Sequence, residues 1–245
     1  MDRRIIKVTD KDISNWRIPS DSNNVIIEIT ERSKDKITKG GVYVGHNEDV
    51  IYAEGEGSHE ADVAEVWGTV TVVPDKLFFD KKYNDAMPWD TDMEVRVGDM
   101  VWFDYLASVN CDVLQAAGRT FYVIHYEDLY VVKREGEIIP LNGYCLCEKI
   151  KRPRQGDLDI TDKYYTDRVK VTYKGKPNRA YRHNDNIYGT YNNDDIDITK
   201  GSVVLLRKNF TPYRLERLEG ISTFSDTPYY VIQRRNMEMV LRNQK

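Results

Sequence analysis

The chain has 245 residues, of which 40% are apolar and 11% aromatic, and its 36 basic and 40 acidic side chains give a net charge of −4. This length accommodates one large domain or two ordinary ones with an apolar core. The sequence contains no apolar run near the roughly 18 residues that a membrane span needs, and its charged start does not resemble a signal peptide. We therefore expect no membrane partner.

The charge is unevenly distributed along the chain. Residues 1–135 carry 16 basic and 26 acidic side chains, a balance of −10, whereas residues 136–245 carry 20 basic and 14 acidic side chains, a balance of +6. The basic residues of the second part are scattered among acidic ones, with no basic run longer than "KRPR", so we expect no nucleic-acid partner. The distribution indicates an acidic module followed by a mildly basic one.

The three cysteines bear on the cellular compartment. Cys111 stands alone, whereas Cys145 and Cys147 fall in the tripeptide "CLC". An odd number of cysteines without a regular spacing is typical of a reducing compartment, so we predict a cytoplasmic location and no structural disulfides. We interpret the "CLC" pair as core packing on one face of a strand.

Short runs of β-forming residues follow one another along the first part of the chain. They cover residues 24–30, 65–73, 99–105, 120–125 and 129–134, separated by turn signals such as "VPDK", "RVGD" and "AAGR". In the first run, a period of two predicts that Val25, Ile27 and Ile29 face the core while Glu28 faces outward. The later runs supply further expected core residues: Val70, Val101, Phe103, Val123 and Val131.

Three blocks of the sequence occur twice in the same order. Residues 121–134, "FYVIHYEDLYVVKR", align without a gap with residues 229–242, "YYVIQRRNMEMVLR". Upstream, "MEVRVGDMVWF" matches "IDITKGSVVLL", with Gly98 and Gly201 at the two turns. Further upstream, "IPSDSNNVIIEITE" corresponds to "IPLNGYCLCEKI". These matches indicate two copies of one unit.

The repeated blocks predict two domains, residues 1–135 and residues 136–245. Because the strands are short, evenly spaced and separated by turns, we predict an all-β fold of two tandem, mostly antiparallel small β-barrels. The copies differ in the middle. In the first copy, 79 residues separate the proline of the Ile-Pro dipeptide from the turn glycine, whereas in the second copy 61 residues do so.

Convergent catalytic residues do not emerge from the sequence. The four histidines form no HxH or HExxH pair, and no dinucleotide-binding, Walker or GxSxG motif is present. Neighbouring carboxylates such as Asp194 and Asp195 fall in a polar turn. We therefore expect that the protein is not an enzyme and has no catalytic, cofactor-binding or metal-binding residues.

The segment "TKGGVYV" combines features of a strand and of a loop. It lies between the charged "ERSKDKI" and the polar "GHNED". Gly40 and Gly41 allow a tight turn. Val42 and Val44 point to one side of an extended segment, and Tyr43 points to the other. The residues alone leave two interpretations open: an edge strand packed in its own domain, or a segment that becomes ordered on a partner.

Taken in order, the blocks of the first repeat resemble the GroES-type co-chaperonins, which cap the folding chamber of a chaperonin ring. "IPSDSNNVIIEITE" stands at the family's lead and first barrel strand, and "TKGGVYV" at its Gly-Gly-aliphatic mobile loop. "VWGTVTVVP", "MEVRVGDMVWFDY" and "FYVIHYEDLYVVKR" resemble its later strands. The resemblance covers most of residues 17–134, with residues 45–62 and 76–92 longer than in a simple family member.

The resemblance implies a tandem, GroES-like co-chaperonin that assembles into a homo-oligomeric ring and binds the apical domains of a chaperonin ring. The second repeat departs from the family pattern, because Gly201-Ser202 replaces Gly-Asp and residues 154–167 occupy the loop position without a Gly-Gly-aliphatic triplet. The implied docking residues therefore all lie in the first repeat: Gly40, Gly41, Val42, Tyr43 and Val44.

Two other function classes compete with this interpretation. A ring-forming structural or assembly protein, for example one encoded by a phage, can use the same fold without binding a chaperonin, because a fold does not fix function. The long polar insertions and the missing second loop favour this alternative. Zinc-dependent alcohol dehydrogenases also contain a GroES-like domain, but they need a dinucleotide-binding domain and Cys/His zinc ligands, and this sequence shows neither.

Overall fold

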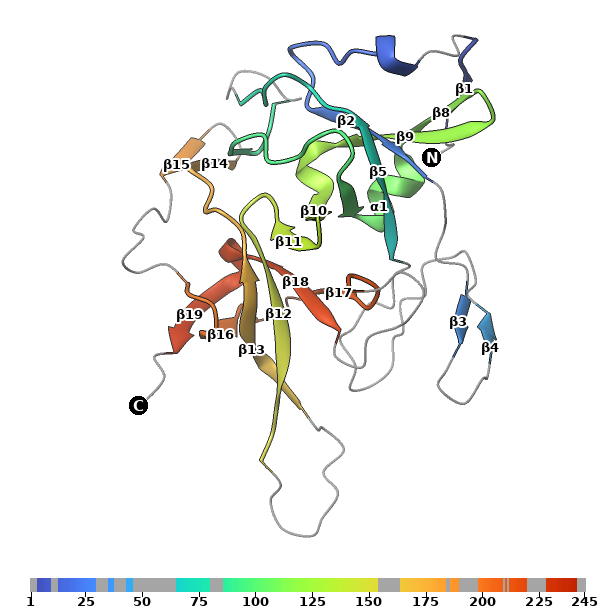
Figure 1. The fold of residues 1–245 in the computed structure, drawn as a ribbon. Helices are drawn as coiled ribbons and strands as arrows, with labels where there is room; N and C mark the ends of the chain where they lie inside the picture. The colour runs from blue at the N-terminus through green and yellow to red at the C-terminus, as the bar shows by residue number, and fades with distance from the viewer. Residues whose placement is uncertain are drawn as a thin grey trace.

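The runs of β-forming residues fold into two large sheets that lie against each other, as the computed structural model of the chain shows (Figure 1). Very little helix is present among the described residues. The structure describes residues 4–9, 13–29, 35–37, 43–45, 65–79, 86–153, 164–183, 186–189, 198–208, 210, 212–219 and 228–241. The all-β prediction is confirmed at this level.

The first sheet has eight strands, seven of them from residues 1–135, the first half, and β11 from the start of residues 136–245, the second half. Apart from the parallel pair β1–β8, its neighbouring strands are antiparallel. In spatial order the strands are β1 (Ile5–Lys7), β8 (Asp112–Ala116), β9 (Arg119–His125), β2 (Asn24–Glu28), β5 (Val66–Val72), β7 (Met100–Phe103), β10 (Leu129–Arg134) and β11 (Glu137–Pro140).

The second sheet has six antiparallel strands and belongs to the second half. Its spatial order is β17 (Tyr213–Leu215), β18 (Tyr229–Gln233), β12 (Tyr144–Lys151), β13 (Tyr164–Lys174), β16 (Val203–Leu206) and β19 (Met237–Leu241). The remaining elements are the small sheet of β15 (Asn186–Gly189), β14 (Ala180–His183) and β6 (Trp89–Asp90), the hairpin of β3 (Asp35–Ile37) and β4 (Tyr43–Gly45), helix α1 (Tyr105–Asn110), and the 3-10 turns η1 (Ile13–Asn15), η2 (Tyr126–Asp128) and η3 (Arg234–Asn236).

The two halves repeat one strand order. The sequence β8-β9-β2-β5-β7-β10 of the first sheet recurs as β17-β18-β12-β13-β16-β19 in the second. Each half ends in a strand, a 3-10 turn and a strand, and each has an irregularity at the same point of its last strand pair. The duplication that the three sequence blocks indicate is therefore present in the strand topology.

The turn glycines show the same correspondence at atomic detail. Gly98 and Gly201 have φ values of +93° and +90°, in a region of backbone conformation that residues other than glycine rarely adopt. The Gly98 amide donates to the carbonyl of Val70 at 2.8 Å, and the Gly201 amide donates to the carbonyl of Val171 at 2.7 Å. Both glycines thus turn the chain into the central strand pair of their own sheet.

Closed barrels, in contrast, are not formed by the described strands. The first sheet ends at β1 and β11, and the second ends at β17 and β19. In the first sheet the outer edge of β10 pairs with β11 and the outer edge of β8 pairs with β1, so these strands have no free edges with which to meet each other. The predicted barrels are therefore replaced by two open sheets.

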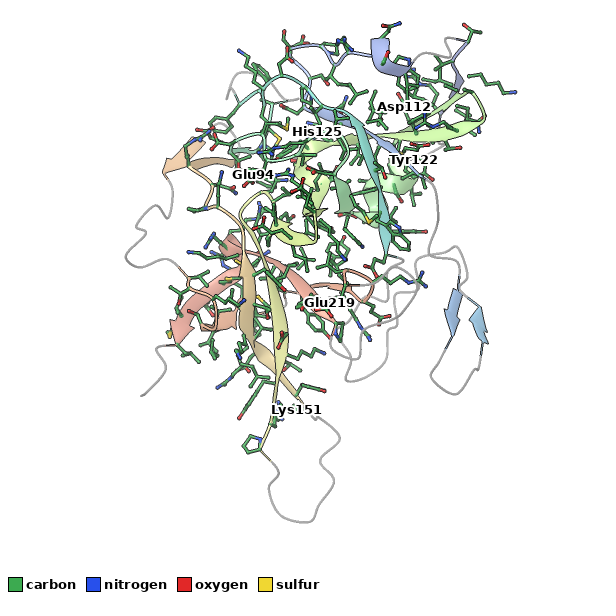
Figure 2. The ribbon with its side chains drawn as sticks, viewed as in Figure 1. Glu94, Asp112, Tyr122, His125, Lys151 and Glu219 are labelled. Carbon is green, nitrogen blue, oxygen red and sulfur yellow. The ribbon has the colours of Figure 1, made fainter. Side chains whose placement is uncertain are left out.

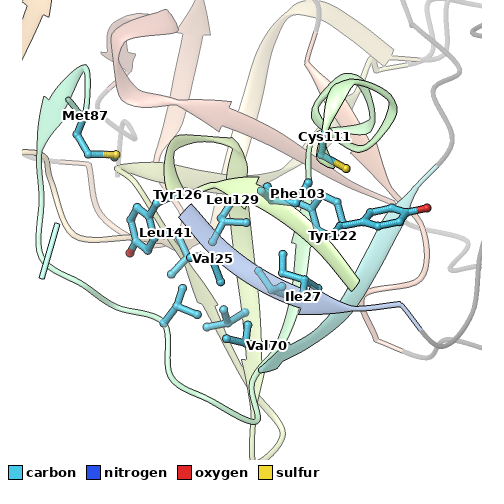
Figure 3. Packing of buried hydrophobic residues seen from close by; sticks show 14 of the residues in the cluster. Val25, Ile27, Val70, Met87, Phe103, Cys111, Tyr122, Tyr126, Leu129 and Leu141 are labelled. Atoms are coloured by element: carbon cyan, nitrogen blue, oxygen red, sulfur yellow. The ribbon is translucent and has the colours of Figure 1, made fainter. Parts of the chain in front are cut away.

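The core of the first half contains most of the residues expected there. Ile29 is partly buried against this cluster, while Glu28 pairs with Arg119 at the outer side of the strand. Figure 3 shows the cluster around β2. The expected residues that are buried in it are Val25, Ile27, Val70, Val101 and Phe103.

Two of the core expectations need correction. Val123 is only partly buried, and its neighbours Tyr122 and Ile124 enter the first core instead. The reason is register: Val123 pairs with Ile26, which faces away from the first core. Val131 is fully buried, but it packs in the cluster between the two halves.

A third buried cluster joins the halves to each other. It combines side chains from β5, β7 and β10 with side chains from β12, β17 and β18, so one apolar region belongs to both sheets. Trp102 lies in it with no exposed surface. Its buried members are Trp67, Trp102, Tyr130, Val131, Leu146, Leu215, Leu218, Tyr229 and Val231.

Asn142 fixes the point where the chain passes from one sheet to the other. It is fully buried with φ +53°, a conformation that asparagine tolerates better than most residues. Its side-chain amide donates to the carbonyls of Tyr126 at 2.7 Å and Leu129 at 3.0 Å, and its side-chain oxygen accepts from the Trp89 indole at 3.0 Å. Its carbonyl accepts from Gln233 at 3.2 Å, so both halves are tied to this residue.

Helix α1, the longest helix among the described residues, is far too short to cross a membrane.

Candidate partner-binding segment

The predicted docking segment falls on a small hairpin. Strand β4 pairs antiparallel with β3, with Ile37 opposite Tyr43 and Lys36 opposite Val44. Tyr43 and Val44 therefore lie in β4, while Gly40, Gly41 and Val42 lie outside the described residues. The two glycines belong to residues 38–42, the connection between the two strands.

The hairpin forms a sheet of its own. Among the described strands, β4 pairs with β3 and with no strand of the two large sheets. Figure 1 shows the pair at a distance from both large sheets, at the β5 side of the first one. The pairing does not match the interpretation of "GVYV" as an edge strand of the first sheet.

The insertion that carries the hairpin, here the whole connection of residues 29–65, begins and ends at two adjacent strands. Glu28 at the end of β2 is opposite Thr69 of β5, and the Ile29 amide donates to the Thr120 carbonyl at 3.0 Å. Gly68 permits the close approach of these strands, because a Cβ at this position would lie 2.5 Å from the Glu28 carbonyl oxygen and 2.5 Å from an Ile27 methyl group. The hairpin is therefore attached to a tightly packed strand pair.

Glu65 anchors the far end of the insertion to the other half of the molecule. Its carboxyl oxygens accept hydrogen bonds from the backbone amides of Glu216 at 3.1 Å and Arg217 at 3.1 and 3.2 Å. Burial raises the pKa of the Glu65 carboxyl to about 7, and the two amides only partly offset this effect. The start of β5 is thus held by both halves.

The second half carries a connection at the equivalent place. Strands β12 and β13 correspond to β2 and β5, and residues 154–163 between them are outside the described part of the chain. The last described pair of this arm is Lys151 with Tyr164, and Figure 2 shows Lys151 at its far end. The expectation that residues 154–167 occupy the loop position of the second repeat is too long at its end, because residues 164–167 belong to β13.

The insertion at residues 76–92 has a structural role that the sequence did not reveal. Its end forms β6, which pairs with β14 of the second half, with Trp89 opposite Tyr181. Met87 is fully buried in the first core. Arg179 of the second half forms ion pairs with Asp90 at 2.8 Å and with Asp92 at 2.6 Å.

The candidate metal ligands and cysteines of the described residues can be placed in the structure. Within the described ranges no group of three or more His, Cys, Asp or Glu side chains could hold a metal ion. Cys111, Cys145 and Cys147 are buried and form no disulfide, and the last two pack in the core of the second half, as the "CLC" interpretation expects. His125 lies 3.4 Å from Glu127. The expectation that the protein is not an enzyme stays a prediction.

No protein-family model matches the chain, and a comparison with curated proteins finds no significant relative.

The pH dependence of stability tests the Glu65 anchor. The carboxyl has its ordinary pKa of 4.5 in the unfolded chain and about 7 in the folded one. Its contribution to the free energy of unfolding is therefore complete below pH 4.5 and is lost as the pH rises to 7. Glu65→Gln keeps an acceptor for the amides but does not titrate. From pH 5 to pH 8 we expect the free energy of unfolding of the wild type to fall by about 1–3 kcal/mol more than that of the variant.

Urea unfolding at the two pH values measures this difference. Glu94 and Asp128 also have pKa values raised to about 7 by burial, and comparing the two proteins cancels their shared contribution. Equal losses in the wild type and the variant would show that Glu65 does not bind a proton on folding.

Proposed function

We propose that this protein is a co-chaperonin that caps a chaperonin ring and assists protein folding without catalysis of its own. The observation that carries the proposal is the hairpin of β3 and β4, which bears Tyr43 and Val44 and extends from a tightly packed strand pair apart from both large sheets. The proposed docking residues lie on it or in its connection: Gly40, Gly41, Val42, Tyr43 and Val44.

The physics of such a segment suits reversible capping. A short segment that orders on its partner loses conformational entropy, so each docking event has modest affinity. A ring that presents several segments together regains affinity and still dissociates. We therefore propose a homo-oligomer, acting in the cytoplasm, whose partners are the chaperonin and further copies of itself. The odd number of cysteines, without a regular spacing, supports a reducing compartment.

The duplication supports a tandem GroES-like scaffold in the proposal, with two open sheets in place of closed barrels within one chain. The second half has the equivalent connection between β12 and β13 but no Gly-Gly-aliphatic triplet. We therefore assign chaperonin binding to the first half alone.

The alternative is a ring-forming structural or assembly protein that does not bind a chaperonin. The observation that favours it is the use of an insertion, residues 86–92, to tie the two halves together through β6 and β14. Such a reinforced joint benefits a permanent assembly more than a transient lid. This alternative predicts self-association without capture by a chaperonin.

Co-elution separates the two functions. The full chain is mixed with a purified chaperonin ring and passed through a size-exclusion column with and without nucleotide. We expect nucleotide-dependent co-elution and a light-scattering mass above that of one chain. An oligomer that never co-elutes would favour the structural protein, and a monomer over a wide concentration range would contradict both.

A further inference from the structure

The two halves contact each other through different faces of the same repeated unit. We define face A as the side of β5, β7 and β10, or of their equivalents β13, β16 and β19, that points away from the core of its own half. Face B is the corresponding side of β8, β9 and β2, or of their equivalents β17, β18 and β12. Within the chain, face A of the first half packs on face B of the second half in one buried cluster. Face A of the first half contributes Trp67, Trp102 and Val131, and face B of the second half contributes Leu146, Leu215 and Tyr229.

Face B of the first half carries an apolar cluster as well, beside the charged Glu28 and Asp112, and the N-terminal segment covers this cluster. Strand pairing assigns Leu114, Phe121 and Ile26 to this face, in the places of Leu215, Tyr229 and Leu146. The Trp16 ring contacts the Phe121 ring edge-on, with centroids 5.1 Å apart. Ile13 and Ile18 pack on the same cluster. The segment of residues 13–18 therefore occupies the surface that the second half uses to bind a face A.

Two halves with two faces each give four faces, and the fourth is face A of the second half. Its cross-strand row Arg168, Leu205 and Met239 corresponds to Trp67, Trp102 and Val131. Met239 is 55% exposed and Leu205 is partly exposed, whereas the two tryptophans are buried. Strand β19 is also an edge of the second sheet, whereas its equivalent β10 is covered by β11.

We propose that face A of the second half binds face B of the first half of a second copy, and that residues 13–18 are a removable cover of that site. The contact would repeat between chains the packing that exists within one chain. A contact between unlike faces is heterologous and propagates to a ring or an open chain. The inference deepens the self-association in the proposed function and does not depend on chaperonin binding.

The charges and the residue types of the two faces fit a reversible contact. The first half is acidic and the second basic, so the association brings together halves of opposite net charge, −10 and +6. Arg168 and Met239 replace Trp67 and Val131, so the contact between chains is less apolar than the contact within the chain. The cover competes with it further, so association requires a higher protein concentration than it would without the cover.

Sedimentation velocity of the full chain tests the cover and the face separately. Ile13→Ser with Trp16→Ser loosens the cover and is expected to move self-association to about tenfold lower concentration. Adding Met239→Asp to that variant removes an apolar contact and adds a charge of the same sign as the acidic first half, so it is expected to return the protein to monomer. Val97→Asp is the matched control, because Val97 is 63% exposed at a turn outside both faces.

Two outcomes would overturn the proposal. One is a folded Ile13→Ser, Trp16→Ser variant that self-associates no more readily than the wild type. Residues 13–18 would then either contribute to the contact between chains or have no role in it. The other is a Met239→Asp substitution that leaves association unchanged. Neither result depends on a chaperonin, so loss of capping alone leaves this inference standing.

Cross-linking tests the same geometry in the wild-type background if the cover variant does not fold. Within the chain, the rings of Tyr130 and Tyr213 lie 5.2 Å apart across the joint. Their equivalents on the two proposed contact faces are Glu238 and Asp112, the latter paired with Arg4 and labelled in Figure 2. Glu238→Cys with Asp112→Cys is expected to form disulfide-linked multimers on oxidation. Glu238→Cys with Val97→Cys is the control, and equal yields from the two pairs would overturn the assignment.

Discussion

The double substitution Val42→Ser with Val44→Ser is expected to abolish detectable binding to a chaperonin ring while both large sheets stay folded. Each docked valine contributes about 1.5 kcal/mol when it is fully buried, so each segment loses roughly 3 kcal/mol. Several segments dock together on one ring, so the loss multiplies across the assembly. The sheets should be unaffected, because the hairpin of β3 and β4 pairs with neither of them.

The equivalent connection of the second half supplies a matched control. Leu158→Ser with Ile160→Ser places the same change between β12 and β13, and we expect a far smaller effect on binding. Chaperonin pull-down measures both variants, and circular dichroism checks that they are folded. Binding lost by the second-half variant and kept by the first-half variant would show that the docking segment is assigned to the wrong half.

The repeat was predictable from the sequence because its signals are local. A run of residues such as 121–134 carries its own strand, turn and strand pattern, and the same pattern recurs at residues 229–242. In both places the structure has a strand, a 3-10 turn and a strand. Turn glycines are local signals too, since Gly98 and Gly201 need positive φ values whatever packs around them.

The joint between the halves was not predictable, because no local pattern states which face of a strand meets which partner. Strand β9 has apolar residues on both faces, so a period of two does not distinguish Val123 from Tyr122. The pairing of Val123 with Ile26 decides the question, and that pairing is long-range. Likewise, the role of Trp89 depends on β14, which lies in the other half of the sequence.

The candidate site likewise has a part that local sequence signals predict and a part that depends on long-range contacts. The Gly-Gly-aliphatic triplet is a local signal, and its hairpin is partly described through Tyr43 and Val44. The anchors at the ends of the insertion are long-range contacts. Glu65 reaches the amides of Glu216 and Arg217 across the joint, and nothing in the spacing of the sequence connects them.

Alanine in place of Trp102 is expected to be among the most destabilising single changes in the molecule. Trp102 is fully buried in the cluster shared by the two halves, and truncation leaves a cavity that the rigid strands on either side do not fill. Core substitutions of this kind cost about 3–5 kcal/mol. Guanidinium unfolding followed by circular dichroism measures the loss.

Trp102→Phe separates packing from hydrogen bonding at this position. The buried Trp102 indole nitrogen has no hydrogen-bond partner among the described residues, so phenylalanine should lose volume but no hydrogen bond. We therefore expect the phenylalanine variant to cost less than half of what the alanine variant costs. Equal losses would mean that the indole nitrogen does have a partner. A small loss in both variants would mean that the stability of the two halves does not depend on this cluster. The packing of face A on face B would then be too weak to hold two chains together when it is repeated between them.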